Sequence, residues 1–117
     1  MGRRNRHDSV WENALTLVNV MRNHQGREPI QTFPMGEIGE PLNCPVSKSI
    51  HASVSCEKII FFDEEIPRGR DIAKLFRLEF KKFNDRGYYI DTPPDIVEFI
   101  NKFDQGGYPT LVEHERK

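Results

Sequence analysis

The feature of this sequence that most constrains its fold is the run Ile59-Ile60-Phe61-Phe62. Four consecutive β-branched and aromatic residues favour a strand and leave both of its faces apolar. A strand with two apolar faces is typical of the covered centre of a sheet. We therefore expect a central strand over residues 54–62, which ends where Asp63-Glu64-Glu65 returns the chain to solvent.

Three segments repeat apolar residues at the spacing of an amphipathic helix. The first covers residues 10–24, the second covers residues 69–86, and the third follows Thr92 and has the clearest pattern. Each of these helices has one apolar face to bury. The apolar positions are, in order, Val10, Ala14, Leu17 and Met21; Ile72, Leu75, Phe76, Phe80 and Phe83; and Ile96, Phe99, Ile100 and Phe103.

Residues with capping preferences mark where these helices begin and end. Ser9-Val10-Trp11-Glu12 forms a capping box at the start of the first helix. Thr92 is expected to cap the third helix, which has proline in its first turn, and Gly87 is expected to stop the second. A shorter helix is predicted to start at Cys44, after the N-cap Asn43, and to end near residues 51–53.

Two further strands complete the predicted sheet, Tyr88-Tyr89-Ile90 and an edge strand at Leu111-Val112. The elements together predict an α+β fold: a small single domain of about three helices packed on a short sheet of two or three strands. We expect this domain to cover residues 9–112, with a basic N-terminal arm at residues 1–8 and a polar tail at residues 113–117.

A long segment without any period lies between the first helix and the short one. Residues 26–43 contain three prolines and three glycines, so we expect a loop with a short extended piece at residues 30–33. Connections of this length are usually either functional or disordered. Both interpretations remain open at the level of the sequence.

Composition narrows the class of protein. The formal net charge is −1 for 117 residues, whereas a domain that depends on a phosphate backbone is usually basic. No apolar run approaches the ~18 residues of a membrane span, and the first thirty residues lack the apolar region of a signal peptide. We therefore expect a cytoplasmic protein without membrane contact, in which Cys44 and Cys56 stay reduced.

Cys44 is the candidate reactive thiol. The predicted helix start would place its sulfur at the positive end of the helix, which favours thiolate. Cys44-Pro45-Val46-Ser47 resembles the active-site pattern of single-thiol thioredoxin-like proteins, and that resemblance implies redox chemistry. The chain departs from that family because no strand precedes the cysteine. The alternative is a buried cysteine that begins a capped helix.

No catalytic or metal-binding constellation is apparent in the sequence. The spacings among His24, Cys44, His51 and Cys56 match no compact zinc pattern. Cys44 and His51 would lie two turns apart, roughly 10 Å along a helix, which is too far for a hydrogen bond. We therefore predict no metal and no cofactor, and we do not expect an enzyme.

Seven basic residues are candidates for contact with a partner. Four of them would share one face of the predicted helix 69–86, where a cationic row can follow phosphates or meet an acidic protein. The alternative is an ordinary solvated helix face. The residues are Arg70, Lys74, Arg77 and Lys81 on the helix, and Arg3, Arg4 and Arg6 in the arm.

Two patches of the sequence carry a resemblance. They are Asn43-Cys44-Pro45 before the short helix, and Pro93-Pro94 with Phe99-Ile100 and Phe103-Asp104-Gln105-Gly106 ahead of Tyr108-Pro109. In these patches the chain resembles short proteins encoded by actinobacteria and their phages. The resemblance implies a bacterial or phage setting and no activity.

Three functional hypotheses follow. The first is a small intracellular, non-catalytic regulator that binds a protein partner, because the long loop and the basic helix face offer exposed surfaces. The second is a nucleic-acid-binding regulator that uses the basic arm and the basic helix face. The third is a thiol-dependent redox or metal-binding protein centred on Cys44.

Overall fold

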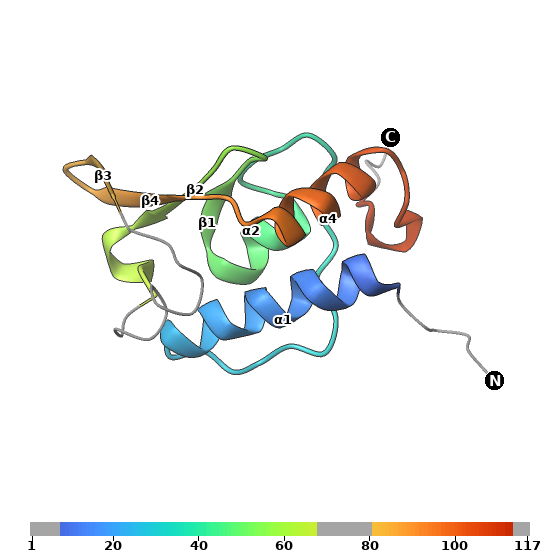
Figure 1. The fold of residues 1–117 in the computed structure, drawn as a ribbon, viewed down its shortest axis with the longest axis horizontal. Coiled ribbons are helices and arrows are strands. Elements are labelled where there is room, and N and C mark those ends of the chain that lie inside the picture. The colour runs from blue at the N-terminus through green and yellow to red at the C-terminus, as the bar shows by residue number, and fades with distance from the viewer. Residues whose placement is uncertain (1–7, 68–80, 114–117) are drawn as a thin grey trace.

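The computed structural model describes residues 8–67 and 81–113 of the chain, and Figure 1 shows their arrangement. Among the described residues two helices come first, the strands follow one another, and a last helix closes the series, which is the grouped order typical of an α+β fold. In chain order the elements are α1 (Ser9–His24), α2 (Pro45–Ile50), β1 (Ala52–Val54), β2 (Lys58–Phe62), the 3-10 helix η1 (Asp63–Glu65), β3 (Lys81–Asn84), β4 (Gly87–Asp91), α4 (Pro94–Asp104) and the 3-10 helix η2 (Pro109–Leu111).

The sheet has four antiparallel strands in the order β1-β2-β4-β3. The α+β class is therefore confirmed, with one strand more than the two or three predicted. β2 lies between β1 and β4, as expected for the apolar run Ile59–Phe62. The prediction of one strand over residues 54–62 is wrong, because Ser55 turns the chain: its hydroxyl accepts the backbone N–H groups of Glu57 and Lys58.

A β-hairpin occupies the position where the second predicted helix was expected to end. Lys81–Asn84 is strand β3, and the Asn84 side chain accepts the backbone N–H of Arg86 (2.8 Å) in the turn. Gly87 does not stop a helix. It lies in β4, where an added Cβ would come within 2.8 Å of the Phe61 carbonyl oxygen. The rest of that prediction, up to residue 80, lies outside the described residues.

The helices cover one face of the sheet. Figure 1 shows α1 below the sheet, α2 between the two, and α4 continuing the chain beyond β4. The first and third predicted helices are confirmed as α1 and α4. Their buried residues meet side chains from the sheet in a single core, with Trp11, Phe33, Phe99 and Tyr108 forming edge-to-face and stacked ring contacts at one end.

The predicted helix caps are displaced by one residue. Asp8, not Ser9, caps α1 by accepting the Trp11 backbone N–H (2.9 Å). Cys44 takes the cap position assigned to Asn43, so that Pro45 opens α2. Pro93 stands at the cap position of α4 because the Thr92 hydroxyl instead donates to the Ser55 carbonyl oxygen (2.7 Å).

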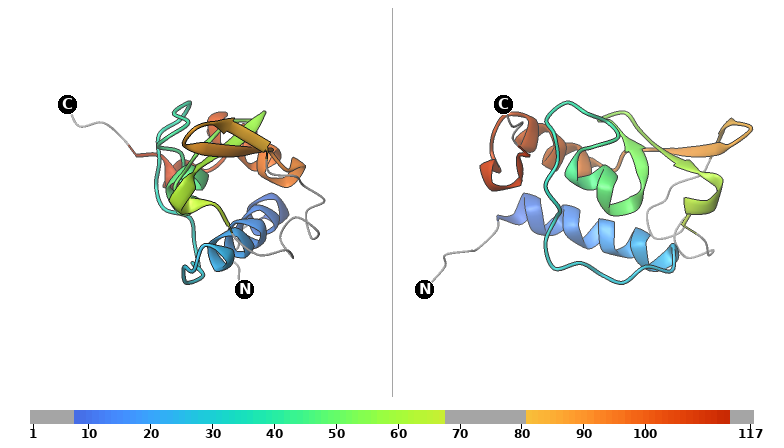
Figure 2. Two further views of the ribbon diagram at one scale, coloured as in Figure 1. Left: turned by 90° about the vertical axis from the view of Figure 1, so that its left-hand side faces the viewer. Right: turned by 180° about the vertical axis from the view of Figure 1, so that it is seen from behind.

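The loop of residues 26–43 contains no strand at residues 30–33. Its first part is held on α1, because the Asn19 side chain both donates to the Ile30 carbonyl oxygen and accepts the Ile30 N–H. Figure 2 shows the loop, in teal, running back along α1 and then rising past α2. Gly36 forms a single parallel bridge with Val112, which replaces the predicted edge strand at residues 111–112.

No helix in the described part of the chain has the length and apolar character that a bilayer crossing requires.

Candidate functional site

Cys44 does not have the environment of a reactive thiol. Its side chain is 6% exposed, and its sulfur accepts the Ser47 backbone N–H (3.3 Å) as the cap of α2. Burial raises the pKa of the Cys44 thiol, and the backbone hydrogen bonds of the cap oppose this only in part. The pKa therefore shifts in the opposite direction to the predicted one.

Cys56 shares a hollow with Cys44. The hollow measures about 150 Å³ and is also lined by Pro41, Val54 and Ile100. Cys56 is exposed, donates to the Asn101 side-chain oxygen (3.3 Å), and has a pKa raised by desolvation. Both thiols are free. Among the described residues no group of three or more His, Cys, Asp or Glu side chains is placed to hold a metal ion.

The placement of Lys81 on the predicted basic helix face is wrong. Lys81 is exposed in strand β3 and pairs in register with Tyr89, so it does not lie on a helix. The other six candidates lie outside the described residues; they are Arg3, Arg4, Arg6, Arg70, Lys74 and Arg77.

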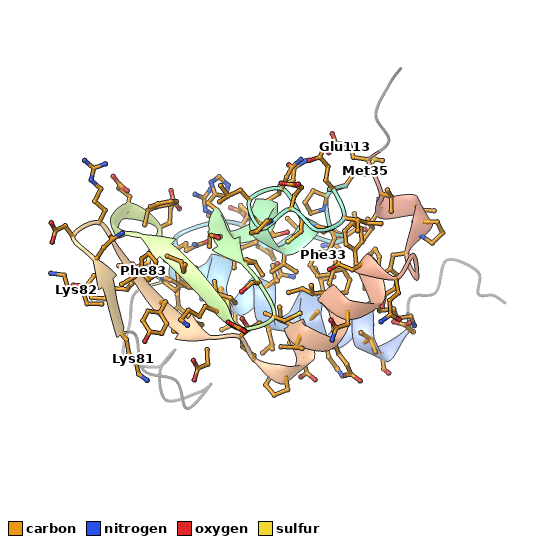
Figure 3. All side chains as sticks on the ribbon, turned by 90° about the horizontal axis from the view of Figure 1, so that it is seen from above. Phe33, Met35, Lys81, Lys82, Phe83 and Glu113 are labelled. Atoms are coloured by element: carbon orange, nitrogen blue, oxygen red, sulfur yellow. The ribbon has the colours of Figure 1, made fainter. Side chains whose placement is uncertain are left out.

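Exposed apolar side chains identify two surfaces, one on the long loop that was expected to be exposed and one on the sheet. In the described residues the large exposed ones are Met35, Ile38, Leu42, Phe62 and Phe83. The first three belong to one loop, and the last two belong to the sheet. Figure 3 shows Met35 and Phe83 toward opposite ends of the molecule.

The first surface is the loop tip, which we define as residues 37–43. The Glu37 N–H donates to the Asn43 carbonyl oxygen (2.8 Å) and closes the tip on itself. Hydrogen bonds to the body hold it at three further points: Gly36 N–H to Leu111 O, Gly39 N–H to Asp104, and Val54 N–H to Pro41 O. These hydrogen bonds fix the backbone of the loop tip, while Ile38 and Leu42 are exposed to solvent.

A shallow hollow of about 380 Å³ lies beside the loop tip. Leu42 (66% exposed) and Phe62 (48% exposed) both line it, together with Lys48, His51 and the first residue of β1. The hollow follows the β1 edge of the sheet. Two outward groups of this edge are already paired: Val54 N–H donates to Pro41 O, and the Ser47 hydroxyl donates to Ala52 O (2.6 Å). These hydrogen bonds obstruct the addition of a strand at this edge.

The second surface is the outer sheet face, defined by Lys58, Ile60, Phe62, Lys81, Phe83 and Tyr89. Lys58, Ile60 and Phe62 alternate with buried Ile59 and Phe61 along β2, so they point away from the helices. Figure 3 looks onto this face, with α1 behind the sheet and Lys81 and Phe83 on β3.

Aromatic and cationic side chains are interleaved on the outer sheet face. Phe83 meets Tyr89 edge to face at 6.2 Å between ring centroids. The Lys58 ammonium lies 5.2 Å from the centre of the Tyr89 ring, within cation–π range. Phe62 stands opposite Gly87, which has no side chain to cover its ring. The face therefore offers flat apolar groups with positive charge beside them.

Comparisons of the chain with protein-family models, with curated proteins and with solved structures found no match. Functional inference for this protein therefore rests on the geometry of its own surfaces.

The sequence contained a signal for one of these surfaces. Lys58, Ile60 and Phe62 show the period of two that separates the faces of a strand, and a polar lysine at one end of the set marks an outward direction. The long loop was expected to be an exposed surface, but the sequence carried no signal for Ile38 and Leu42, because exposed apolar residues in an irregular segment follow no period.

Proposed function

We propose that this protein is a small non-catalytic binding protein that acts through a protein partner, which it contacts with the loop tip. The observation that carries the proposal is the combination of exposed Ile38 and Leu42 with a backbone tied down at Gly36, Gly39 and Pro41. A loop that is already ordered loses little conformational freedom on binding, so its apolar contacts contribute more fully to affinity.

The charge of the loop tip indicates the chemistry of the partner. Glu37 and Glu40 flank the apolar residues, and Asp104 lies against Gly39. These carboxylates repel phosphate and favour a protein surface that has an apolar depression edged by lysine or arginine. The loop tip therefore fits a protein better than a nucleic acid.

The test compares two variants of the full chain. Ile38→Ser with Leu42→Ser removes the apolar contacts, and Phe83→Ser removes an equally exposed apolar side chain at the other end of the molecule. A protein retained from a lysate of the source organism is purified, and its affinity for each variant is measured by titration calorimetry. We expect the loop variant to weaken binding at least about ten-fold and Phe83→Ser to leave it unchanged.

A third variant tests the role of loop order. An added Cβ at Gly36 would come within 2.5 Å of the Asn43 carbonyl oxygen, so Gly36→Ala displaces the loop tip without altering its exposed side chains. We expect this variant to lose partner affinity as well. Equal affinity of the purified partner for wild type and for the Ile38→Ser, Leu42→Ser variant would refute the proposal.

A further inference from the structure

The outer sheet face meets the loop tip at the hollow that Leu42 and Phe62 share, and it has the opposite charge. On β2, β3, β4 and the turn that joins the last two, the ionisable cations are Lys58, Lys81, Lys82 and Arg86, against the carboxylates Asp85 and Asp91. These three strands and the turn together therefore have an excess of two positive charges in a chain whose net charge is −1. A ligand that selects this face is expected to be anionic.

The apolar groups on the face narrow the class of ligand that fits it. Three aromatic rings, Phe62, Phe83 and Tyr89, come from three neighbouring strands. Two of them are 48% exposed, so their rings are accessible rather than packed in the core. An anion with flat apolar groups of its own would use both the rings and the lysines.

Single-stranded nucleic acid has this combination of properties. Its bases stack on aromatic side chains, and its phosphates need cations beside them. A duplex keeps its bases stacked on each other, so it cannot use the rings. We propose that the outer sheet face binds single-stranded nucleic acid, with bases stacked on Phe62, Phe83 and Tyr89 and phosphates held by Lys58 and Lys81.

The geometry assigns distinct roles to the two lysines. Lys58 lies over the Tyr89 ring, so its charge sits beside a stacking position. Lys81 is in register with Tyr89 on the far side of β4 and is exposed. The two cations thus flank Tyr89 across the strands, and a strand of nucleic acid crossing the sheet at this row passes both.

Binding is measured by fluorescence anisotropy with the full chain and labelled homopolymers of thymidine and of uridine, on the order of ten nucleotides long. A duplex of equal length and mixed sequence is the third probe. We expect both single strands to bind more tightly than the duplex. The difference between the thymidine and uridine probes shows whether the 2′-hydroxyl contributes.

Variants of the face separate stacking from charge. Phe62→Ala and Phe83→Ala should each weaken single-strand binding at least about five-fold. Lys58→Ala with Lys81→Ala should lower the slope of log affinity against log salt by about 1.4. Lys102→Ala, which removes a lysine near the end of helix α4 beside Asp8, away from this face, is the matched control and should leave the slope unchanged. Circular dichroism verifies that each variant is folded.

Three results would overturn the inference. One is the absence of oligonucleotide binding by the wild-type chain, in which case the face would be a surface for a protein ligand. Another is a duplex that binds as tightly as the single strands. The third is wild-type affinity in a folded double variant, Phe62→Ala with Phe83→Ala, because the binding would then come from another part of the chain. Ile38 does not line the hollow that Leu42 shares with Phe62, so the single variant Ile38→Ser should bind oligonucleotides normally, and the two proposals fail independently.

Discussion

The two faces of the four-stranded sheet carry similar side chains in opposite surroundings. On the inner face Ile59, Phe61 and Ile90 are buried under the helices, whereas on the outer face Phe62 is half exposed and Ile60 and Tyr89 are only partly covered. Both sets come from the same strands, and both are apolar and aromatic. The comparison shows that an apolar strand residue stabilises the fold only where a second layer covers it.

The largest expected effect comes from emptying the inner face. Phe61 is fully buried in the core, so Phe61→Ala should lower the free energy of unfolding by about 3–5 kcal/mol, through lost burial and the cavity left behind. Urea denaturation followed by circular dichroism measures the change. Ile90→Val removes only one methyl group from the same layer and should cost about 1 kcal/mol. If Phe61→Ala lowered the free energy of unfolding by less than about 1 kcal/mol, the inner face would not be the core.

The burial of Phe61 also shows where prediction from sequence succeeded. The stripes of α1 and α4 predicted their helices, since a period near 3.6 has a direct physical cause in one buried face. The apolar run predicted β2 as an inner strand of the sheet. The same run also predicted that both faces of this strand are covered. That was wrong for Phe62, because the sequence of a strand does not show whether the fold places a layer on each of its faces.

The prediction that the second helix continues to residue 86 was wrong for a different reason. Phe80 and Phe83 fit a helical spacing, but Asn84-Asp85-Arg86 is a turn signal between aromatic residues, and it joins β3 to β4 in the structure. The displaced cap of α1 has a long-range cause. Asp8 and Ser9 are both good cap residues, and the choice of Asp8 follows from its contacts with Lys102 and Tyr108, which are distant in sequence.

The second prediction concerns Gly87, where the backbones of β2 and β4 lie in close contact. Gly87 is buried in β4, and an added Cβ would lie 2.8 Å from the Phe61 carbonyl oxygen. Gly87→Ala should therefore destabilise the protein by about 1–3 kcal/mol, because the two central strands would have to move apart. Gly106→Ala is not a suitable control, since Gly106 has a positive φ of 86°. Asn84→Ala, which removes only the turn hydrogen bond, should cost less.

The third prediction concerns the attachment of the layer that covers the inner face. Asp8 caps α1 and also accepts hydrogen bonds from Tyr108 (2.9 Å) and from Lys102 at the end of α4. Asp8→Ala should cost about 1 kcal/mol of stability. Partial burial raises the pKa of Asp8, but hydrogen bonds from Lys102, Trp11 and Tyr108 outweigh it and lower the pKa below its ordinary value of 3.8.

The direction of this shift sets the pH dependence. A carboxyl group whose pKa is lower in the folded state contributes stability above its unfolded value, and that contribution is lost as the pH falls through the folded value. We therefore expect the stability of the wild type to fall below about pH 4 and that of Asp8→Asn to fall less steeply. Tyr108→Phe removes one donor and should give an intermediate slope. Identical slopes for all three would show that Asp8 does not link α1 to α4.

The smallest expected effect tests the outer face directly. Phe62 lies opposite Gly87 and is 48% exposed, so Phe62→Ser should change the free energy of unfolding by less than about 0.5 kcal/mol. Its neighbour Phe61, one residue away on the same strand, differs only in the face to which it points. A loss comparable with that of Phe61→Ala would mean that another layer covers the outer face in solution. The ring would then be unavailable for stacking, and the proposed single-strand site would lose the free surface on which it depends.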